Sequence, residues 1–229
     1  MSKNLADNDE YPAMLNLHQR CVSMLGNLWH IPKGESAIGT ATTGSSEAIL
    51  LGGLAMKRKW FEKRQALGKD TSKPNILMGA NAQVALEKFA RYFEVEARII
   101  PVSKESKYCL DATKIRDYAD ENTIGIFVIL GSTYTGHYEP VARVAEILDD
   151  LEKETGLDIP IHVDGASGAF FCPFATPSVK FGFEIHRVKS INAYDPCEFT
   201  NVALGTNTDL FIPGSGGLFG GTKRSFQSI

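Results

Sequence analysis

From residue 75 onward, short apolar runs of strand length alternate with longer segments whose apolar residues recur at helical spacing. The apolar runs cover residues 75–79, 97–102, 123–130 and 159–163, and the helical segments cover 82–93, 111–120 and 139–154. The runs are continuously apolar, as expected for strands that are buried on both faces. This β/α alternation predicts the α/β class, with a mostly parallel sheet covered by helices on both sides.

Two more helices are predicted before the alternation begins. Residues 11–30 carry apolar side chains at helical spacing, and Pro12 suits a first helical turn. Residues 48–65 form a second helical pattern, which follows a segment of small residues. Ser45 or Ser46 is therefore expected at the N-terminus of this long helix.

The pattern changes near the end of the chain. Residues 187–192 can supply one more short strand, but from Ala193 onward no helical or strand period persists, and six glycines fall between residues 205 and 229. We therefore expect a large domain over residues 1–192 and a poorly ordered tail over residues 193–229.

Composition excludes several classes of function. With 229 residues, of which 43% are hydrophobic, the chain can bury a sizeable core. A net charge of −3, with scattered basic residues, offers no basic face for nucleic acid or a membrane surface. The four cysteines form no CxxC pair, which argues against a zinc site or a disulfide framework and favours a reducing cytoplasm. No apolar run is long enough to span a bilayer, and the start lacks the apolar core of a signal peptide.

Three elements are candidates for one binding site. Ser45 and Ser46 open a helix, where backbone N–H groups and hydroxyls can bind a phosphate, although serine also caps helices routinely. Thr133 lies in a Ser/Thr/Gly segment, residues 131–136, directly after a predicted strand, and this segment can equally be a simple turn.

Asp164 is the third element. It closes the predicted strand 159–163 and is followed by the small residues Gly165 and Ala166. A carboxylate in that position needs a partner, so it is either a capping group or the counter-ion of a bound cationic ring. His162 is read as a hydrogen-bonded strand residue, and no group of residues indicates a metal site.

Many segments, in order along the chain, resemble the pyridoxal-phosphate-dependent glutamate decarboxylases. They include GTATTGSSEA at 39–48, KFARY at 88–92, TYTG at 133–136 and the stretch that starts with HVD at 162–164. The others are residues 5–12, 20–25, 28–30 and 121–125. The resemblance covers residues 5–192 and is specific to this branch of pyridoxal-phosphate enzymes.

The resemblance implies the large domain of the aspartate-aminotransferase type, fold type I, a three-layer α/β/α arrangement that binds pyridoxal 5′-phosphate. It also implies a role for each candidate residue. The cofactor phosphate would be held by Ser45 and Ser46, and the pyridinium nitrogen by Asp164. Of the other three, Gln83 would cover one ring face, Ala166 would pack beneath the ring, and Thr133 would lie near the ring or its phenolic oxygen.

One essential part of the family pattern is missing. In the family, the strand matching residues 187–192 leads into Ser-Gly-His-Lys, whose lysine forms a Schiff base with the cofactor. An ungapped match puts Cys197 at the lysine position, and a match to the later apolar run puts Asn207 there. Lys189 matches a non-catalytic position, and Lys223 has no matching context, so we expect no catalytic residue in this chain.

The resemblance also implies that the chain is the middle of the enzyme, without the N-terminal segment and the small C-terminal domain. Loss of similarity after residue 193 is what a read-through intron or a frameshift would produce. Three functions remain open: a homo-oligomeric glutamate decarboxylase of L-glutamate, inactive as this chain alone; a truncated isoform that binds full-length subunits; or another decarboxylase of the same cofactor group. Gln83 disfavours the last, because relatives acting on aromatic amino acids carry histidine there.

Overall fold

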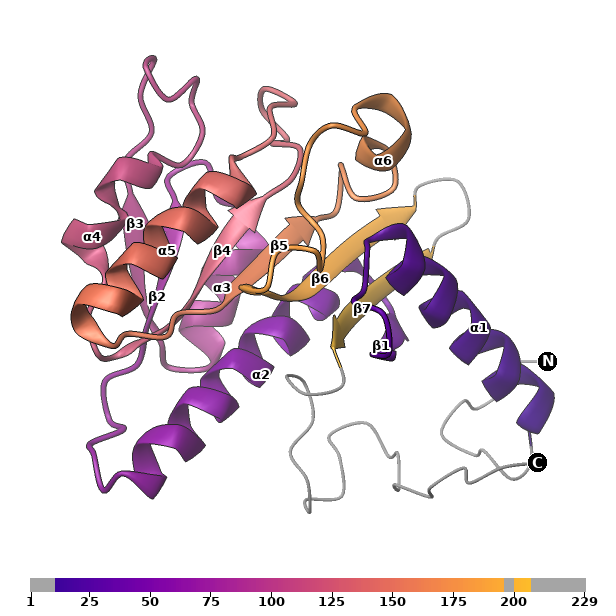
Figure 1. Cartoon of the computed structure of the whole chain (residues 1–229), viewed down its shortest axis with the longest axis horizontal. Helices are drawn as coiled ribbons and strands as arrows, with labels where there is room; N and C mark the ends of the chain where they lie inside the picture. Colours follow the sequence, from indigo (N-terminus) through magenta and orange to yellow (C-terminus); the bar gives the residue numbers. More distant parts are fainter. Residues whose placement is uncertain (1–10, 196–199, 207–229) are drawn as a thin grey trace.

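The computed structural model describes residues 11–195 and 200–206, in which a seven-stranded sheet lies between two layers of helices (Figure 1). The strands are β1 (Ala37–Thr42), β2 (Asn75–Gly79), β3 (Glu96–Ile100), β4 (Thr123–Ile129), β5 (Ile161–Gly165), β6 (Val188–Asp195) and β7 (Thr200–Thr206). The helices are α1 (Pro12–Leu28), α2 (Ser45–Ala66), α3 (Val84–Tyr92), the 3-10 turn η1 (Ala112–Lys114), α4 (Ile115–Tyr118), α5 (Val141–Thr155) and α6 (Cys172–Ala175).

The strand order is β1-β7-β6-β5-β4-β2-β3. Of the described strands, β7 runs antiparallel to both of its neighbours, and the other adjacent pairs are parallel. The predicted mostly parallel α/β sheet is confirmed. Because β2, β4, β5 and β6 point the same way, the loops that follow them gather at one edge of the sheet.

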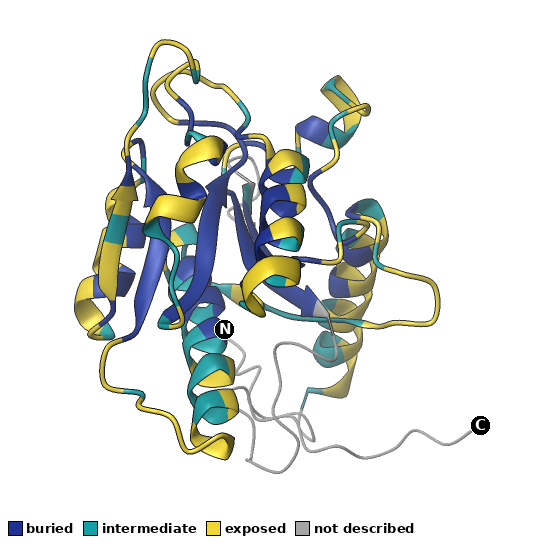
Figure 2. Ribbon diagram, turned by 60° about the vertical axis from the view of Figure 1, so that its left-hand side comes forward, coloured by how far each residue is buried: buried dark blue, intermediate teal, exposed yellow. Residues whose placement is uncertain are grey.

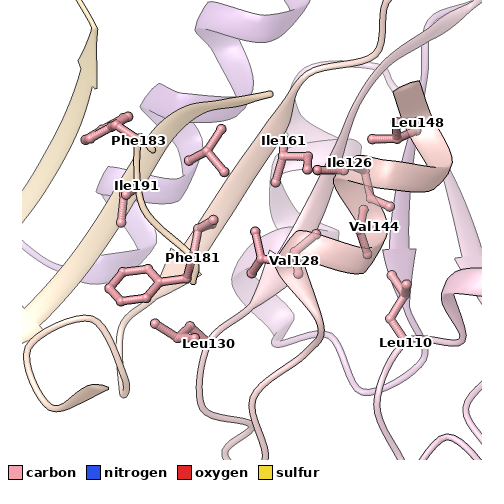
Figure 3. Packing of buried hydrophobic residues seen from close by; sticks show 14 of the residues in the cluster. Leu110, Ile126, Val128, Leu130, Val144, Leu148, Ile161, Phe181, Phe183 and Ile191 are labelled. Atoms are coloured by element: carbon pink, nitrogen blue, oxygen red, sulfur yellow. The ribbon is translucent and has the colours of Figure 1, made fainter. Parts of the chain in front are cut away.

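Alternating side chains divide the core between the two faces of the sheet. On β2, Ile76 and Met78 pack with residues of α2 and α3, whereas Leu77 joins the cluster on the opposite face. Figure 3 shows this second cluster, in which Val144 of α5 lies near Val128 of β4. Figure 2 shows the central strands buried and the helices exposed on their outer sides.

Helix α2 packs closely against its neighbours because glycines lie at the points of contact. A Cβ at Gly52 would come within 2.4 Å of the His162 ring, and a Cβ at Gly53 would come within 2.5 Å of the Phe89 ring. Where Gly125 of β4 leaves room, the side chain of Met56 fills it. The absence of side chains at Gly52 and Gly125 therefore brings α2 against β5 and β4, and at Gly53 it brings α2 against α3.

The structure corrects the predicted end of the ordered domain. Strand β6 continues to Asp195, and β7 occupies residues 200–206 within the segment expected to be an unstructured tail. Strand β1 was not predicted either. Gly39 explains how β1 and β7 pair, because a Cβ there would meet the Ala203 carbonyl oxygen at 2.5 Å. The rest of the predicted tail, with Cys197 and Asn207, lies outside the described residues.

Among residues 11–195 and 200–206, no helix combines the length and the apolar character that crossing a bilayer requires.

Candidate functional site

Asp164 lies at the carboxyl end of β5 and is the most deeply buried of the predicted site residues, at 3% exposure. Its Oδ1 accepts hydrogen bonds from the Asn192 side-chain amide at 2.9 Å and from the Ala166 backbone N–H at 3.2 Å. Burial raises the pKa of Asp164, and these two donors partly oppose the rise. The described residues supply no cation to this carboxylate, so the site favours a positively charged partner.

Ser45 and Ser46 are the first two residues of α2, as predicted. Gly44 is extended at the N-cap, where its missing side chain makes no capping bond. Instead the Glu47 carboxylate accepts hydrogen bonds from the Thr43 backbone N–H and hydroxyl, at 2.6 and 2.8 Å. These bonds hold the segment before the helix, and the serine hydroxyls lie at the positive end of a 22-residue dipole.

Asn192 joins these two parts of the site. Its amide nitrogen donates to Ser45 Oγ at 3.0 Å and to Asp164 Oδ1 at 2.9 Å. The side chain comes from β6, where Asn192 is the register partner of Asp164 on β5. The structure thus places the predicted phosphate-binding serine and the predicted ring-binding aspartate on the same amide group.

Gln83 and Thr133 form a second pair at the same edge of the sheet. Gln83 is the N-cap residue of α3, after β2, and Thr133 lies in the loop after β4. The Gln83 amide nitrogen donates to the Thr133 hydroxyl, and both side chains are exposed. Gln83 and Thr133, both predicted to lie at the cofactor ring, are therefore in contact and exposed.

Glu139 organises the loops that carry this pair. The residue is 1% exposed, and its Oε1 accepts hydrogen bonds from the Asn81 amide and the Leu110 backbone N–H, both at 2.9 Å. Its Oε2 accepts from the Ile129 backbone N–H at 2.7 Å. Burial raises the pKa of Glu139, and the nearby Asp164 adds to the rise. One carboxylate therefore ties the segments that follow β2 and β3 to the end of β4.

The chemistry of these groups fits a phosphorylated pyridine ring. Hydroxyls at a helix N-terminus suit a phosphate, and a buried carboxylate without a cation suits a protonated ring nitrogen. Ala166 donates its backbone N–H to Asp164, which fixes the turn after β5. The packing role predicted for its side chain stays a prediction.

Asn192 and Glu139 were not among the predicted site residues. A sequence signal for Asn192 exists, because polar residues recur at every second position on two buried strands. His162 and Asp164 on β5 are the register partners of Ser190 and Asn192 on β6. Period-two spacing puts all four on one face of the sheet. For Glu139 there is no comparable signal, because its partners come from three separate segments.

His162 is a buried structural histidine, as predicted. Its Nδ1 lies 2.6 Å from the Ser190 hydroxyl and its Nε2 lies 2.8 Å from the Asn192 side-chain oxygen. Burial lowers the pKa of His162 to about 4, which keeps the imidazole neutral near neutral pH.

The substitution Gly52→Ala should destabilise the protein by about 2 kcal/mol, because the new methyl group would press on an imidazole that is hydrogen-bonded on both sides. Urea unfolding measures the loss. Gly53→Ala is the matched control, since it presses on Phe89 instead. We expect both variants to lose stability and only Gly52→Ala to shift the NMR signals of His162. Unchanged stability in Gly52→Ala would contradict the tight contact.

Comparison with known proteins identifies the family. A model of the pyridoxal-dependent decarboxylase conserved domain matches residues 1–208, which extends past the predicted boundary at 192. Glutamate decarboxylase of Saccharomyces cerevisiae is 55% identical over 204 residues, which are 84% of this chain and 35% of that protein. Glutamate decarboxylase of Solanum lycopersicum is 53% identical over 194 residues, 84% of this chain and 38% of that protein.

Among solved structures, the glutamate decarboxylase of Lactobacillus brevis matches with a TM-score of 0.83 and 39% identity, over 90% of this chain and 47% of that chain. This match confirms the expected large-domain fold of type I. The chain spans less than half the length of each of these relatives. Pyridoxal phosphate is the cofactor of the family whose domain matches here, and the matched relatives are carbon–carbon lyases. The chain belongs to the pyridoxal-dependent decarboxylase family.

Proposed function

We propose that this chain is the cofactor-binding part of a cytoplasmic, homo-oligomeric glutamate decarboxylase, in which L-glutamate loses carbon dioxide and becomes 4-aminobutyrate. The observation that carries the proposal is the buried carboxylate of Asp164, bridged by Asn192 to Ser45 at the start of α2. The identity to glutamate decarboxylases, 55% with the yeast protein, supports the choice of substrate.

Each predicted residue has a role in this proposal. Ser45 and Ser46 bind the phosphate with their hydroxyls and the helix N-terminus. Asp164 holds a proton on the ring nitrogen, because a buried carboxylate favours a cation beside it. When bound, pyridoxal phosphate supplies an electron-accepting ring for the electrons released as the carboxylate leaves.

The remaining side chains orient the ring and its substituents. Gln83 covers one ring face, and Thr133, which accepts its hydrogen bond, lies at the ring or its phenolic oxygen. Ala166 leaves space beneath the ring because its side chain is small. The phosphate is then held from helix α2 and the ring nitrogen from strand β5, so that the ring keeps a single orientation.

The chain contains no lysine between Lys189 and Lys223, and neither of these matches the family's Schiff-base position. A covalent lysine holds the cofactor and speeds its exchange with substrate. We therefore propose that residues 1–229 alone bind the cofactor without a covalent bond and do not turn over glutamate.

Binding of pyridoxamine 5′-phosphate tests the proposed site, because this amine carries the phosphate and the ring but cannot form a Schiff base with lysine. Equilibrium dialysis of the full chain should show binding, and Asp164→Asn should weaken it at least about tenfold through loss of a charged hydrogen bond. Asp150→Asn is the matched control, since Asp150 is exposed on α5.

Two results would contradict this proposal. Equal affinity in the wild type and Asp164→Asn would remove Asp164 from the site. Production of 4-aminobutyrate by purified residues 1–229, supplied with pyridoxal phosphate and L-glutamate, would show that the missing lysine is not required.

A second candidate is a non-catalytic subunit that binds full-length relatives. Exposed apolar side chains favour it: Leu17 and Met24 on α1, and Phe171 and Phe174 at α6, are 59, 68, 65 and 74% exposed. Such side chains are frequently covered in assemblies. Co-expression with a tagged full-length relative tests this, and recovery of the chain only as a separate monomer would exclude it.

A further inference from the structure

A continuous chain of buried polar side chains crosses from β6 to β5 and back, on the face of the sheet covered by α2. Ser190 contacts His162 Nδ1 at 2.6 Å, His162 Nε2 contacts Asn192 Oδ1 at 2.8 Å, and the Asn192 amide nitrogen reaches Asp164 and Ser45. None of the four residues that lie in the sheet is more than 4% exposed. Water therefore does not compete for these hydrogen bonds.

The hydrogen bonds between these side chains all run in one direction, from donor to acceptor, and Asp164 determines that direction. Asp164 Oδ1 also accepts the Ala166 backbone N–H and is therefore an acceptor, so Asn192 turns its nitrogen toward Asp164 and its oxygen toward His162. That oxygen can only accept, so His162 carries its proton on Nε2. The neutral ring then has a lone pair on Nδ1, which accepts from the Ser190 hydroxyl.

Packing prevents the His162 ring from leaving this arrangement. Gly52 of α2 lies against one part of the ring, so closely that a Cβ there would be 2.4 Å away. Phe127 of β4 meets the ring edge-on, with centroids 5.4 Å apart. The histidine therefore acts as a fixed support whose Nε2–H can reach only Asn192.

The orientation of the Asn192 amide determines which hydrogen bonds the Ser45 hydroxyl and the Asp164 carboxylate can make to a ligand. Ser45 accepts one amide hydrogen on its oxygen, which leaves its own O–H free to donate to an anion. Asp164 receives the other amide hydrogen on Oδ1, which stabilises its ionised form. The reversed amide would put an oxygen against the carboxylate and would remove both donors.

We infer that Asn192 is a positioning residue that aligns Ser45 and Asp164 for one ligand, and that His162 holds its amide in the required orientation. The inference rests on the proposed cofactor site. It adds two residues, neither of which needs to touch the cofactor.

The first experiment measures the histidine itself and needs no cofactor. In protein labelled with ¹⁵N-histidine, His162 should show a protonated Nε2 and an unprotonated Nδ1 near neutral pH, with its signals identified by their loss in His162→Gln. Ser190→Ala should perturb this pattern. A proton on Nδ1, or an imidazolium, would overturn the inference, whether or not the cofactor binds.

The second experiment measures binding of pyridoxamine 5′-phosphate. Asn192→Leu removes both donors and should weaken binding about tenfold, the equivalent of one or two lost hydrogen bonds. Asn75→Leu is the matched control, because Asn75 is also fully buried in the sheet but lies at the start of β2. Equal losses in the two variants would reduce Asn192 to a general structural role and overturn the inference.

Two substitutions at His162 separate orientation from packing. His162→Gln retains an N–H donor that can reach Asn192, whereas His162→Phe fills the space without one. We expect affinity within about twofold of wild type for glutamine and a several-fold loss for phenylalanine. Equal affinity in the two variants would contradict the role of His162. Failure of the wild type to bind at all would instead refute the proposed cofactor site and leave the tautomer result standing.

Discussion

Replacing Glu139 by leucine is expected to lower the free energy of unfolding by about 4 kcal/mol. The substitution leaves the Leu110 and Ile129 backbone N–H groups and the Asn81 amide without their acceptor. Each buried donor without a partner costs about 1–3 kcal/mol, and relief from burying a carboxylate offsets part of the sum. Urea unfolding measures the total. Hydrogen exchange should show the Leu110 and Ile129 amides among those that lose protection.

Two variants separate this effect from a general loss of charge. Glu139→Gln keeps one acceptor oxygen but turns an NH₂ group toward a backbone donor, so we expect about half of the loss. Glu146→Leu removes an exposed carboxylate on α5, the helix that follows Glu139, and should change stability by less than about 0.5 kcal/mol. If Glu139→Leu were as stable as Glu146→Leu, the three segments would not depend on this carboxylate.

Acid should destabilise the protein through His162 by about 3 kcal/mol. The pKa of His162 is lowered from 6.5 to about 4 in the folded protein. At pH values between these two, the unfolded chain binds up to one proton more at this residue than the folded chain does. The stability that neutral His162 contributes is therefore fully present above pH 6.5 and is lost as the pH falls toward 4. The physical cause is burial, since a charged imidazole has no water around it in this position.

Comparison with His162→Gln isolates this contribution, because glutamine does not titrate. Urea unfolding of both proteins across this pH range should show a steeper loss of stability in the wild type as pH falls. Asp164 and Glu139 act in the opposite direction, since their raised pKa values make stability fall as pH rises. Their effect cancels in the comparison because the wild type and His162→Gln both retain them. Parallel pH profiles would show that His162 is not neutral and buried as described.

Much of the site follows from local patterns. Small residues before an amphipathic helix predict Ser45 and Ser46 at its N-terminus, and the end of a continuously apolar strand predicts a buried Asp164. Thr133 follows a predicted strand, whereas Gln83 is named only through the family resemblance. Parallel strands bring the loops that carry both residues to one edge of the sheet. The predicted positions are confirmed because each depends on a few neighbouring residues and on the direction of the strands, and the binding roles stay predictions.

The features that the sequence did not predict depend on pairing over long distances. Strand β7 has no strong period of its own and is stabilised by β1 and β6 on either side, which lie far from each other in sequence. Glu139 begins a helical segment, and only the fold brings Asn81, Leu110 and Ile129 to it. Local propensity carries no information about such partners.

The sequence by itself determines the α/β class, the alternation of strands and helices from residue 75 to residue 163, and the positions of Ser45 at the start of a helix and of Asp164 at the end of a strand. These depend on hydrophobic periodicity and on residue chemistry, which are local. Only the tertiary structure decides that Asn192 joins Ser45 to Asp164 and that His162 supports it. Hydrogen-bond direction depends on which buried donors and acceptors meet, and that is settled when β5, β6 and α2 pack together.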